Sequence, residues 1–494
     1  MEGVSEKLSI EPVFPFVIGN ENVPAIAKKI FDLLDQETLL KARGLCKEWK
    51  QQVDEKTSFW SLYSSERYQK AAQKGRIDII RNLVYYTNDP NPADKDGETP
   101  LHVAACHGFI EVCKLLLQHI GEEYPRNTDG DTPLHMAAKS GHADVCKLLL
   151  NRFDEKDPKA IDGCTPLHFA AEEGQVEVCR LLLDHGLDAD PKGSEDEHTP
   201  LHLAALHGRT EVCKLLLEHV KEKGPRNIDE QTPLHLAAQR GMSEVCKLLL
   251  EHIGTTHPRD SEGQTPLHLA AQNRQLKVCQ LLVEHFDEKS PCDADGQTPL
   301  HLAAGRGAKD VCKLLLEYVD EKHPKDLDER TPLHFAAVRG NVTVCQMLLE
   351  HFVEKHPRDW KRQTPLHLAA SYGNAEVCKL LVEHVDKEDP RTTGGETPLH
   401  KAAKNGKAEA CKVLLEHTDD KQPRNKKGRT PLHLAAFWGT ADVCKLILKH
   451  VDNKYPRDRD GLTPHDLACH NHNPGVAALF KELENNRKSK SKKN

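Results

Sequence analysis

The sequence predicts an all-α repeat solenoid, a rod of stacked helix pairs joined by hairpin-like loops. Three observations carry this prediction. The tetrapeptide Thr-Pro-Leu-His occurs eleven times at intervals of 33 residues, with one interval of 34. Each copy has its own helix start and stop signals, yet none is long enough to bury its apolar residues alone. A chain of 494 residues is also too long for one ordinary hydrophobic core.

Each copy encodes two helices. Thr is a good N-cap, Pro suits the first helical position, and the Leu-x-x-Ala spacing gives one buried stripe. A glycine such as Gly141 ends this first helix. The second helix has the pattern Glu-Val-Cys-Lys-Leu-Leu-Leu, as in residues 111–117. The copies begin at Thr99, Thr132, Thr165, Thr199, Thr232, Thr265, Thr298, Thr331, Thr364, Thr397 and Thr430, and a decayed copy begins at Thr463.

The period, the Thr-Pro-Leu-His signature and the Ala-Ala that follows it resemble the ankyrin-repeat family over roughly residues 62–485. The resemblance implies an ankyrin solenoid that works by binding other proteins. We expect eleven repeats over residues 99–462. A degenerate N-capping repeat is expected at 61–98 and a degenerate C-capping repeat at 463–485. Residues 1–21 and the basic tail 486–494 are expected to be disordered.

The chain departs from the family at the end of the second helix. Where the family usually has Gly, this sequence has Val220, Ile253 or Phe286 at equivalent places. Because a bulky residue at positive φ is strained, we expect the helix to run about one turn longer. It would then stop before the recurring proline, as at Pro225.

The many cysteines and histidines fit packing better than metal binding. Eleven of the 16 Cys occupy one position of the second helix, where a free thiol behaves as a small apolar side chain. Eleven His belong to the tetrapeptide, where the ring can bond the backbone of its own or the adjacent repeat. No Cys-x-x-Cys pair occurs in the sequence. We therefore expect neither a metal nor a cofactor.

Residues 22–60 fall outside the repeat and predict a small helical module. Its pattern resembles an F-box in Val23-Pro24, Ile30-Phe31, Leu34-Asp35, Leu39-Leu40, Cys46-Lys47-x-Trp49 and Phe59-Trp60. The resemblance implies docking to a Skp-type adaptor of a cullin–RING ubiquitin ligase, with contacts from Pro24, Ile30, Phe31 and Leu34. A helical cap that merely covers the solenoid is the alternative.

Other classes of function find little support. The sequence has no phosphate-binding loop, no Gly-x-Ser-x-Gly turn and no His-Glu-x-x-His pair, so we expect no catalytic residues and no enzyme activity. A net charge of −8 argues against a surface built for nucleic acid. No secretory signal or membrane-spanning stretch is visible, and the cysteines suggest a reduced compartment, the cytoplasm or nucleus.

Positions that vary between copies are free to bind a partner. They are the loop tip before each Thr and the two residues after Ala-Ala. The candidate partner-binding residues are Trp360, Tyr372, Phe437, Trp438, Arg306, Arg330, Arg339 and Arg362. Because interface anchors are rich in aromatics and Arg, we expect an acidic protein segment over residues 300–440. Earlier copies carry acidic residues in these rows, such as Glu172 and Glu173.

Together the two resemblances imply a substrate-recruiting subunit of a cullin–RING ubiquitin ligase. The repeats would hold the target protein and the N-terminal segment would hold the adaptor. The alternative is a scaffold without a ligase link.

Overall fold

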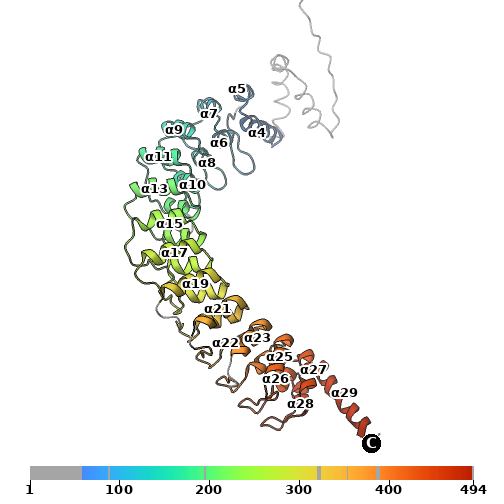
Figure 1. The fold of residues 1–494 in the computed structure, drawn as a ribbon. Helices are drawn as coiled ribbons and strands as arrows, with labels where there is room; N and C mark the ends of the chain where they lie inside the picture. Colours follow the sequence, from blue (N-terminus) through green and yellow to red (C-terminus); the bar gives the residue numbers. More distant parts are fainter. Residues whose placement is uncertain are drawn as a thin grey trace, which may run out of the picture.

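The computed structural model describes residues 58–491, except 87–88, 194–195, 320–323, 353 and 385–389. Within these residues, 26 helices (α4 to α29) form consecutive pairs that stack into a curved rod (Figure 1). The same residues contain no strand, apart from a single bridge between Gly193 and His198. The predicted helical solenoid is confirmed. The F-box-like segment lies outside the described residues, except for its last residues, which begin α4.

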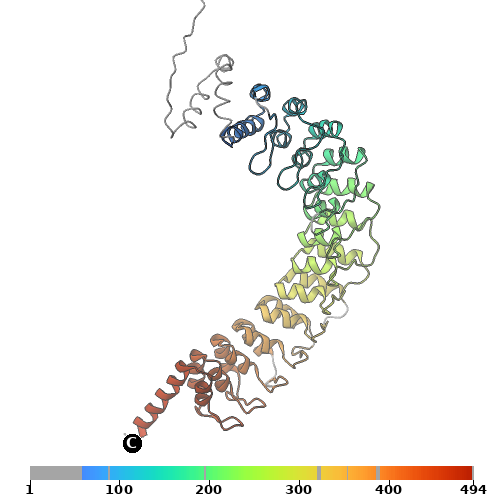
Figure 2. The ribbon, with the colours of Figure 1, turned by 180° about the vertical axis from the view of Figure 1, so that it is seen from behind.

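The first helices of successive pairs pack on one another and form one layer of the rod, which lies on its concave side in the N-terminal half (Figures 1 and 2). We call the face formed by these first helices and the loop tips the concave face. These helices are α4 (Ser58–Gln73), α6 (Pro100–Cys106), α8 (Pro133–Ser140), α10 (Pro166–Glu173), α12 (Pro200–Leu206), α14 (Pro233–Arg240), α16 (Pro266–Gln272), α18 (Pro299–Arg306), α20 (Pro332–Arg339), α22 (Pro365–Tyr372), α24 (Pro398–Lys404), α26 (Pro431–Phe437) and α28 (Pro464–His470).

The second helices form the opposite layer and pack on one another in the same way. They are α5 (Ile77–Tyr86), α7 (Ile110–Leu117), α9 (Ala143–Arg152), α11 (Val176–Asp184), α13 (Thr210–His219), α15 (Ser243–Leu250), α17 (Leu276–His285), α19 (Lys309–Tyr318), α21 (Val342–His351), α23 (Ala375–His384), α25 (Ala408–His417), α27 (Ala441–His450) and α29 (Pro474–Ser491). None of the helices in the described residues is both long and apolar enough to span a membrane.

The predicted extra turn of the second helix is wrong. Helix α13 ends at His219, six residues before Pro225, and α17 ends at His285, six residues before Pro291. Val220 and Phe286 are extended, with φ of −72° and −84°, so neither takes the strained left-handed conformation. The helix therefore stops at the usual place without a glycine.

A lysine replaces the glycine as the C-terminal cap. The Lys289 ammonium donates hydrogen bonds to the carbonyls of Val283 and Phe286, the last acceptors of α17. Lys223 does the same for Leu217 and Val220 of α13. Lys156, Lys355 and Lys421 make equivalent bonds. Each of these lysines stands two residues before the recurring proline, so the cap is a repeated sequence feature.

The core is one continuous layer between the two rows of helices. The eleven cysteines of the second helices are all buried, as predicted. At the ends of the array, Tyr68 and Ile80 of the first pair and Phe480 of α29 are also fully buried. Because each pair covers its apolar faces only by contact with its neighbours, stability accumulates along the rod.

Candidate protein-binding groove

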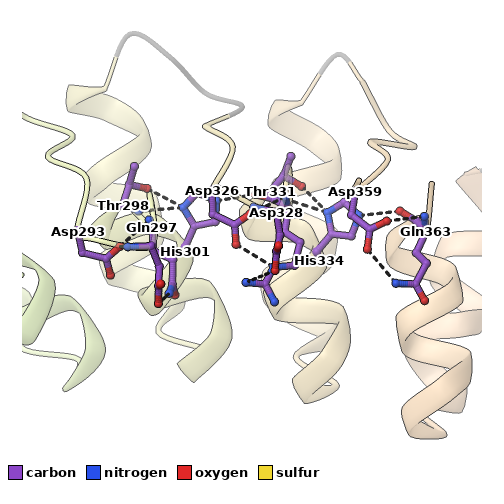
Figure 3. A network of polar contacts seen from close by, with 12 residues as sticks. Asp293, Gln297, Thr298, His301, Asp326, Asp328, Thr331, His334, Asp359 and Gln363 are labelled. Carbon is purple, nitrogen blue, oxygen red and sulfur yellow. Dashed lines mark hydrogen bonds and ion pairs between the residues drawn. The ribbon is translucent and has the colours of Figure 1, made fainter. Parts of the chain in front are cut away.

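A histidine from each tetrapeptide fixes the loops relative to the helices. In the repeat that begins at Thr298, Nδ1 of His301 accepts the backbone N–H of Thr298 at 3.0 Å and also contacts the Thr298 hydroxyl at 3.0 Å. Its Nε2 lies 2.9 Å from the carbonyl of Arg330, in the next loop (Figure 3). His334 repeats the pattern with Thr331 and the carbonyl of Gln363. The sequence predicted a bond to the backbone of the ring's own or the adjacent repeat, and these rings make both bonds.

This geometry selects one tautomer. Since Nδ1 accepts an N–H, the ring proton sits on Nε2, which donates to the carbonyl of the neighbouring repeat. Burial lowers the pKa of His301 and of His334 to about 4 in each case, more than the bonds to Arg330 and Gln363 raise it. The rings are therefore neutral at physiological pH, and their hydrogen bonds hold adjacent repeats together.

Most loop tips are closed by the side-chain oxygen of an Asp or Asn, which accepts backbone N–H groups of its own tip. The Asp326 carboxylate accepts the N–H of Asp328 at 3.0 Å and that of Arg330 at 2.7 Å. Asp359 holds the next tip in the same way, through the N–H groups of Lys361 and Gln363 (Figure 3). Such local side-chain bonds make a tip rigid.

Adjacent tips are also bonded to each other, which leaves one side chain of each tip directed outward. The N–H of Trp360 donates to the carbonyl of Asp328 at 3.1 Å, and the N–H of Leu327 donates to that of Asp295 at 2.9 Å. The side chains at this position are strongly exposed, 76% for Leu327 and 56% for Trp360. The backbone thus presents these residues for contact.

Five of the eight candidate partner-binding residues surround one hollow on the concave face. They are Arg306, Arg330, Arg339, Trp360 and Tyr372. The hollow has a volume of about 420 Å³ and spans the ends of α16, α18, α20 and α22 and the tips opposite them. Its other lining residues are Gln272, Gln297, Leu302, Gly305, Asp328, His334, Phe335, Val338, Asp359, Lys361, Gln363 and Leu368.

The cations around this hollow differ in how far they are compensated. Arg330 is paired with Asp326 at 2.8 Å and with Asp328 at 3.3 Å, and its guanidinium lies 5.1 Å from the centroid of the Phe335 ring. The guanidinium groups of Arg306 and Arg339 make no hydrogen bond or ion pair with any residue in the described part of the chain. These two arginines are exposed and are available to a ligand.

The aromatic side chains of the hollow are equally accessible. Trp360 carries the Lys361 ammonium 4.4 Å from its ring centroid, and Tyr372 is 59% exposed at the end of α22. Cations stacked on aromatic faces and exposed rings of this kind are typical of interface anchors. The hollow therefore combines apolar contact area with positive charge.

The other three candidates lie outside the hollow. Phe437 and Trp438 form their own cluster at the end of α26, with ring centroids 5.5 Å apart. The Lys404 ammonium lies 5.3 Å from the Trp438 ring. Arg429 lies over Phe437 at 5.7 Å but is paired with Asp458 at 3.1 Å. Arg362 is exposed at a tip and has a φ of 58°.

Some residues of the hollow had not been selected from the sequence. Leu302, Phe335 and Leu368 occupy one half-buried position of successive first helices and form the apolar floor. Gly305 and Val338 stand directly after Ala-Ala, a variable position, so that signal was available.

The remaining predictions concern residues elsewhere. The adaptor-contact residues Pro24, Ile30, Phe31 and Leu34 lie outside the described residues. In the described part, no group of three or more His, Cys, Asp or Glu side chains is placed to hold a metal ion.

Comparison with known families agrees with the architecture. A family model described as ankyrin repeats (three copies) matches residues 69–162, 152–227, 220–292, 285–359, 352–425 and 418–489. No curated protein matches the chain. These matches cover most of the sequence and coincide with the stacked helix pairs, so the chain belongs to the ankyrin-repeat family.

Proposed function

We propose that this protein binds a partner protein and that the concave groove over residues 300–440 holds an acidic segment of that partner. Ankyrin repeats suggest a role in protein–protein interaction. The observation that favours this particular groove is the gathering of Trp360, Tyr372, Arg306 and Arg339 around one hollow. The aromatic rings offer apolar area, and the two uncompensated arginines attract carboxylates.

The test compares proteins captured by the full chain with those captured by variants. Trp360→Ala and Trp438→Ala, alone and together, separate the hollow from the cluster on α26. Arg306→Glu with Arg339→Glu reverses the charge of the hollow. Ile161→Ala is the matched control, because Ile161 is a 78% exposed tip residue far from residues 300–440.

We expect the Trp360 and double-arginine variants to lose the same captured proteins, while Ile161→Ala retains them. Unchanged capture by all variants, with unchanged circular dichroism, would contradict the assignment of this groove. Loss with Trp438→Ala alone would move the binding surface to α26.

We further propose that the N-terminal segment links this protein to a cullin–RING ubiquitin ligase through a Skp-type adaptor, so that the bound partner is its substrate. The support is the F-box resemblance of residues 22–60. Phe59 and Trp60 at the end of that segment belong to α4, which continues into the first pair of the rod. A module built on these residues would be joined to the solenoid without a flexible linker.

Binding of the full chain to a purified Skp-type adaptor tests this link. Ile30→Ala with Leu34→Ala should abolish adaptor binding and leave partner capture by the groove intact. If the unmodified chain fails to bind the adaptor, the scaffold without a ligase link becomes the better description. In either case we propose a non-catalytic protein of the cytoplasm or nucleus, where its many thiols would remain reduced.

A further inference from the structure

Helix α18 contains a glycine, Gly305, at a position where every other Thr-Pro-Leu-His repeat has a side chain. Glycine is the poorest helix former after proline, so its presence near the end of a helix needs a reason. The equivalent residues in the other repeats are Cys106, Lys139, Glu172, Leu206, Gln239, Gln272, Val338, Ser371, Lys404 and Phe437.

The backbone conformation does not require this glycine. Gly305 is helical and is absent from the residues with positive φ. Its carbonyl accepts a hydrogen bond from the Asn341 side chain at 3.1 Å. Asn374 makes the same bond to the carbonyl of Val338 at 2.9 Å, where a β-branched side chain is present. The same backbone arrangement therefore tolerates a side chain.

Steric crowding does not require it either. A Cβ atom placed on Gly305 would lie 3.6 Å from both Cβ and Cδ1 of Phe335, which is an ordinary van der Waals contact. A larger side chain would extend from there over Phe335 into the hollow. The absence of a side chain at Gly305 therefore leaves open space on the groove floor, and neither the backbone conformation nor the packing of the free protein requires that space.

The walls of this space indicate what could fill it. Leu302, Phe335 and Val338 make its floor apolar. The polar groups nearby are already bonded, since His334 donates to Gln363 and Asp359 is held by its own tip. No buried side-chain polar atom without a partner, among those the structure describes, belongs to the lining. An apolar group meets these walls at no cost in lost hydrogen bonds.

We propose that the space over Gly305 receives one bulky apolar side chain of the bound segment, and that Arg306 and Arg339 contact acidic residues on either side of it. This inference rests on the proposed function of the groove. A single anchor is expected, because the equivalent positions on the two neighbouring helices carry Gln272 and Val338. The partner motif is thus an aromatic or large aliphatic residue flanked by acidic residues.

The test uses the full chain and three synthetic, dye-labelled peptides of equal length. One has a central Phe flanked by Glu, one has Ala in place of the Phe, and one has the Phe flanked by Lys. Fluorescence anisotropy gives Kd for the unmodified protein, Gly305→Leu, Gly305→Ala and Gln239→Leu. Gln239 occupies the same helical position in α14, outside the hollow, so its Leu variant is the matched control.

For the unmodified protein and Gln239→Leu, we expect the Glu-flanked Phe peptide to bind about tenfold more tightly than the Ala peptide, as burial of a large apolar side chain would give. In Gly305→Leu this ratio should fall below about twofold, while thermal stability does not decrease. Gly305→Ala adds one Cβ atom in ordinary van der Waals contact and should reduce the ratio partially. This variant still tests the anchor site if Gly305→Leu misfolds.

Two failures are distinguishable. If Glu-flanked peptides bind the unmodified protein no better than the Lys-flanked peptide, the proposed acidic groove is wrong. If the Glu-flanked peptides bind but Phe and Ala are not discriminated, or discrimination survives in Gly305→Leu, the anchor site is wrong while the groove stands.

Discussion

Mild acid should destabilise this solenoid through its tetrapeptide histidines. Each of these rings is buried, accepts a backbone N–H on Nδ1 and donates from Nε2 to the next repeat, as His301 does. A proton on Nδ1 would place two donors against each other. Burial lowers the pKa to about 4 or about 3 in ten of the eleven: His102, His135, His168, His202, His235, His268, His301, His334, His367 and His400.

The direction and size of the effect follow from linkage. In the unfolded chain these histidines titrate near pH 6.5, so on acidification the unfolded state takes up protons first. Their contribution to stability is complete above about pH 6.5 and is lost as the pH falls toward about 4. At pH 5 each ring with a pKa of about 4 has lost ~2 kcal/mol. Ten such losses, on the order of 20 kcal/mol, are similar to the lower end of the stability expected for a rod of this length, at about 0.05–0.15 kcal/mol per residue.

Some carboxyl groups act in the opposite direction. Burial raises the pKa of Asp131 and of Asp157 to about 6, so protonation of these groups stabilises the folded state as the pH falls below that value. Both are partly exposed, and solvent screening reduces their contribution. Burial also raises the pKa of Glu98, Asp190, Asp260 and Asp293. These six carboxyl groups are fewer than the ten buried imidazoles, so they offset only part of the loss.

Urea unfolding followed by far-ultraviolet circular dichroism at pH 7.5, 6.5, 5.5 and 5.0 measures the effect. The urea midpoint should change little down to about pH 6.5 and then fall steeply, with recovery on return to pH 7.5. His301→Gln should lower the midpoint at pH 7.5 and reduce its dependence on pH. A midpoint that stays constant between pH 7.5 and 5.0 would refute the reasoning, because it would show that folding does not lower the pKa of the buried histidine rings.

Three further outcomes are expected. A thiol reagent should modify Cys292 and Cys469 rapidly and Cys106 more slowly in the folded chain, as mass spectrometry of labelled peptides would show. The second-helix cysteines, such as Cys279, are buried, and burial raises their pKa to about 12, so they should react only on unfolding. Lys289→Met should lower the thermal midpoint through the loss of a helix cap worth ~1 kcal/mol. Arg362→Gly should raise the thermal midpoint, since a side chain at a φ of 58° costs about 1 kcal/mol.

Local signals account for what the sequence predicted correctly. Thr followed by Pro caps and starts every first helix from α6 to α26, and the pairing of Thr with His three residues later is satisfied within four residues, as in α18. These contacts do not depend on the rest of the fold. The end of the second helix was missed because the residue that caps it, such as Lys289, acts from outside the helix and three residues beyond Phe286. The lysine before the recurring proline is visible in the sequence, but its role as a helix cap can be recognised only once the path of the loop is known.

The groove was predicted in part for a similar reason. Exposed aromatic residues such as Trp360 can be recognised in the sequence because they occupy a variable position of the repeat. Which of them meet depends on how tips and helix ends face each other across the concave surface, and this brought Trp360 to Tyr372 but not to Trp438. Gly305 contributes to the hollow because it has no side chain. The sequence alone does not show this role, because the open space is defined by the neighbouring Phe335 in the folded structure.

The charge of the loop tips gives an independent reason why an acidic segment would occupy the C-terminal part of the rod. The tip position that Lys361 occupies in its repeat is acidic in the eight preceding repeats: Asp96, Asp129, Asp162, Asp196, Asp229, Glu262, Asp295 and Asp328. Two unit charges ~10 Å apart in water interact by ~0.4 kcal/mol, and salt weakens this further. Seven small repulsions of this kind, from Asp96 to Asp295, would disfavour every register along the repeats before the hollow. Asp328 in the hollow is paired with Arg330 at 3.3 Å, and Lys361 and Lys427 then attract an acidic segment. The invariant residues build a rod that is nearly the same along its length, so only such differences between repeats can fix where along it a partner lies.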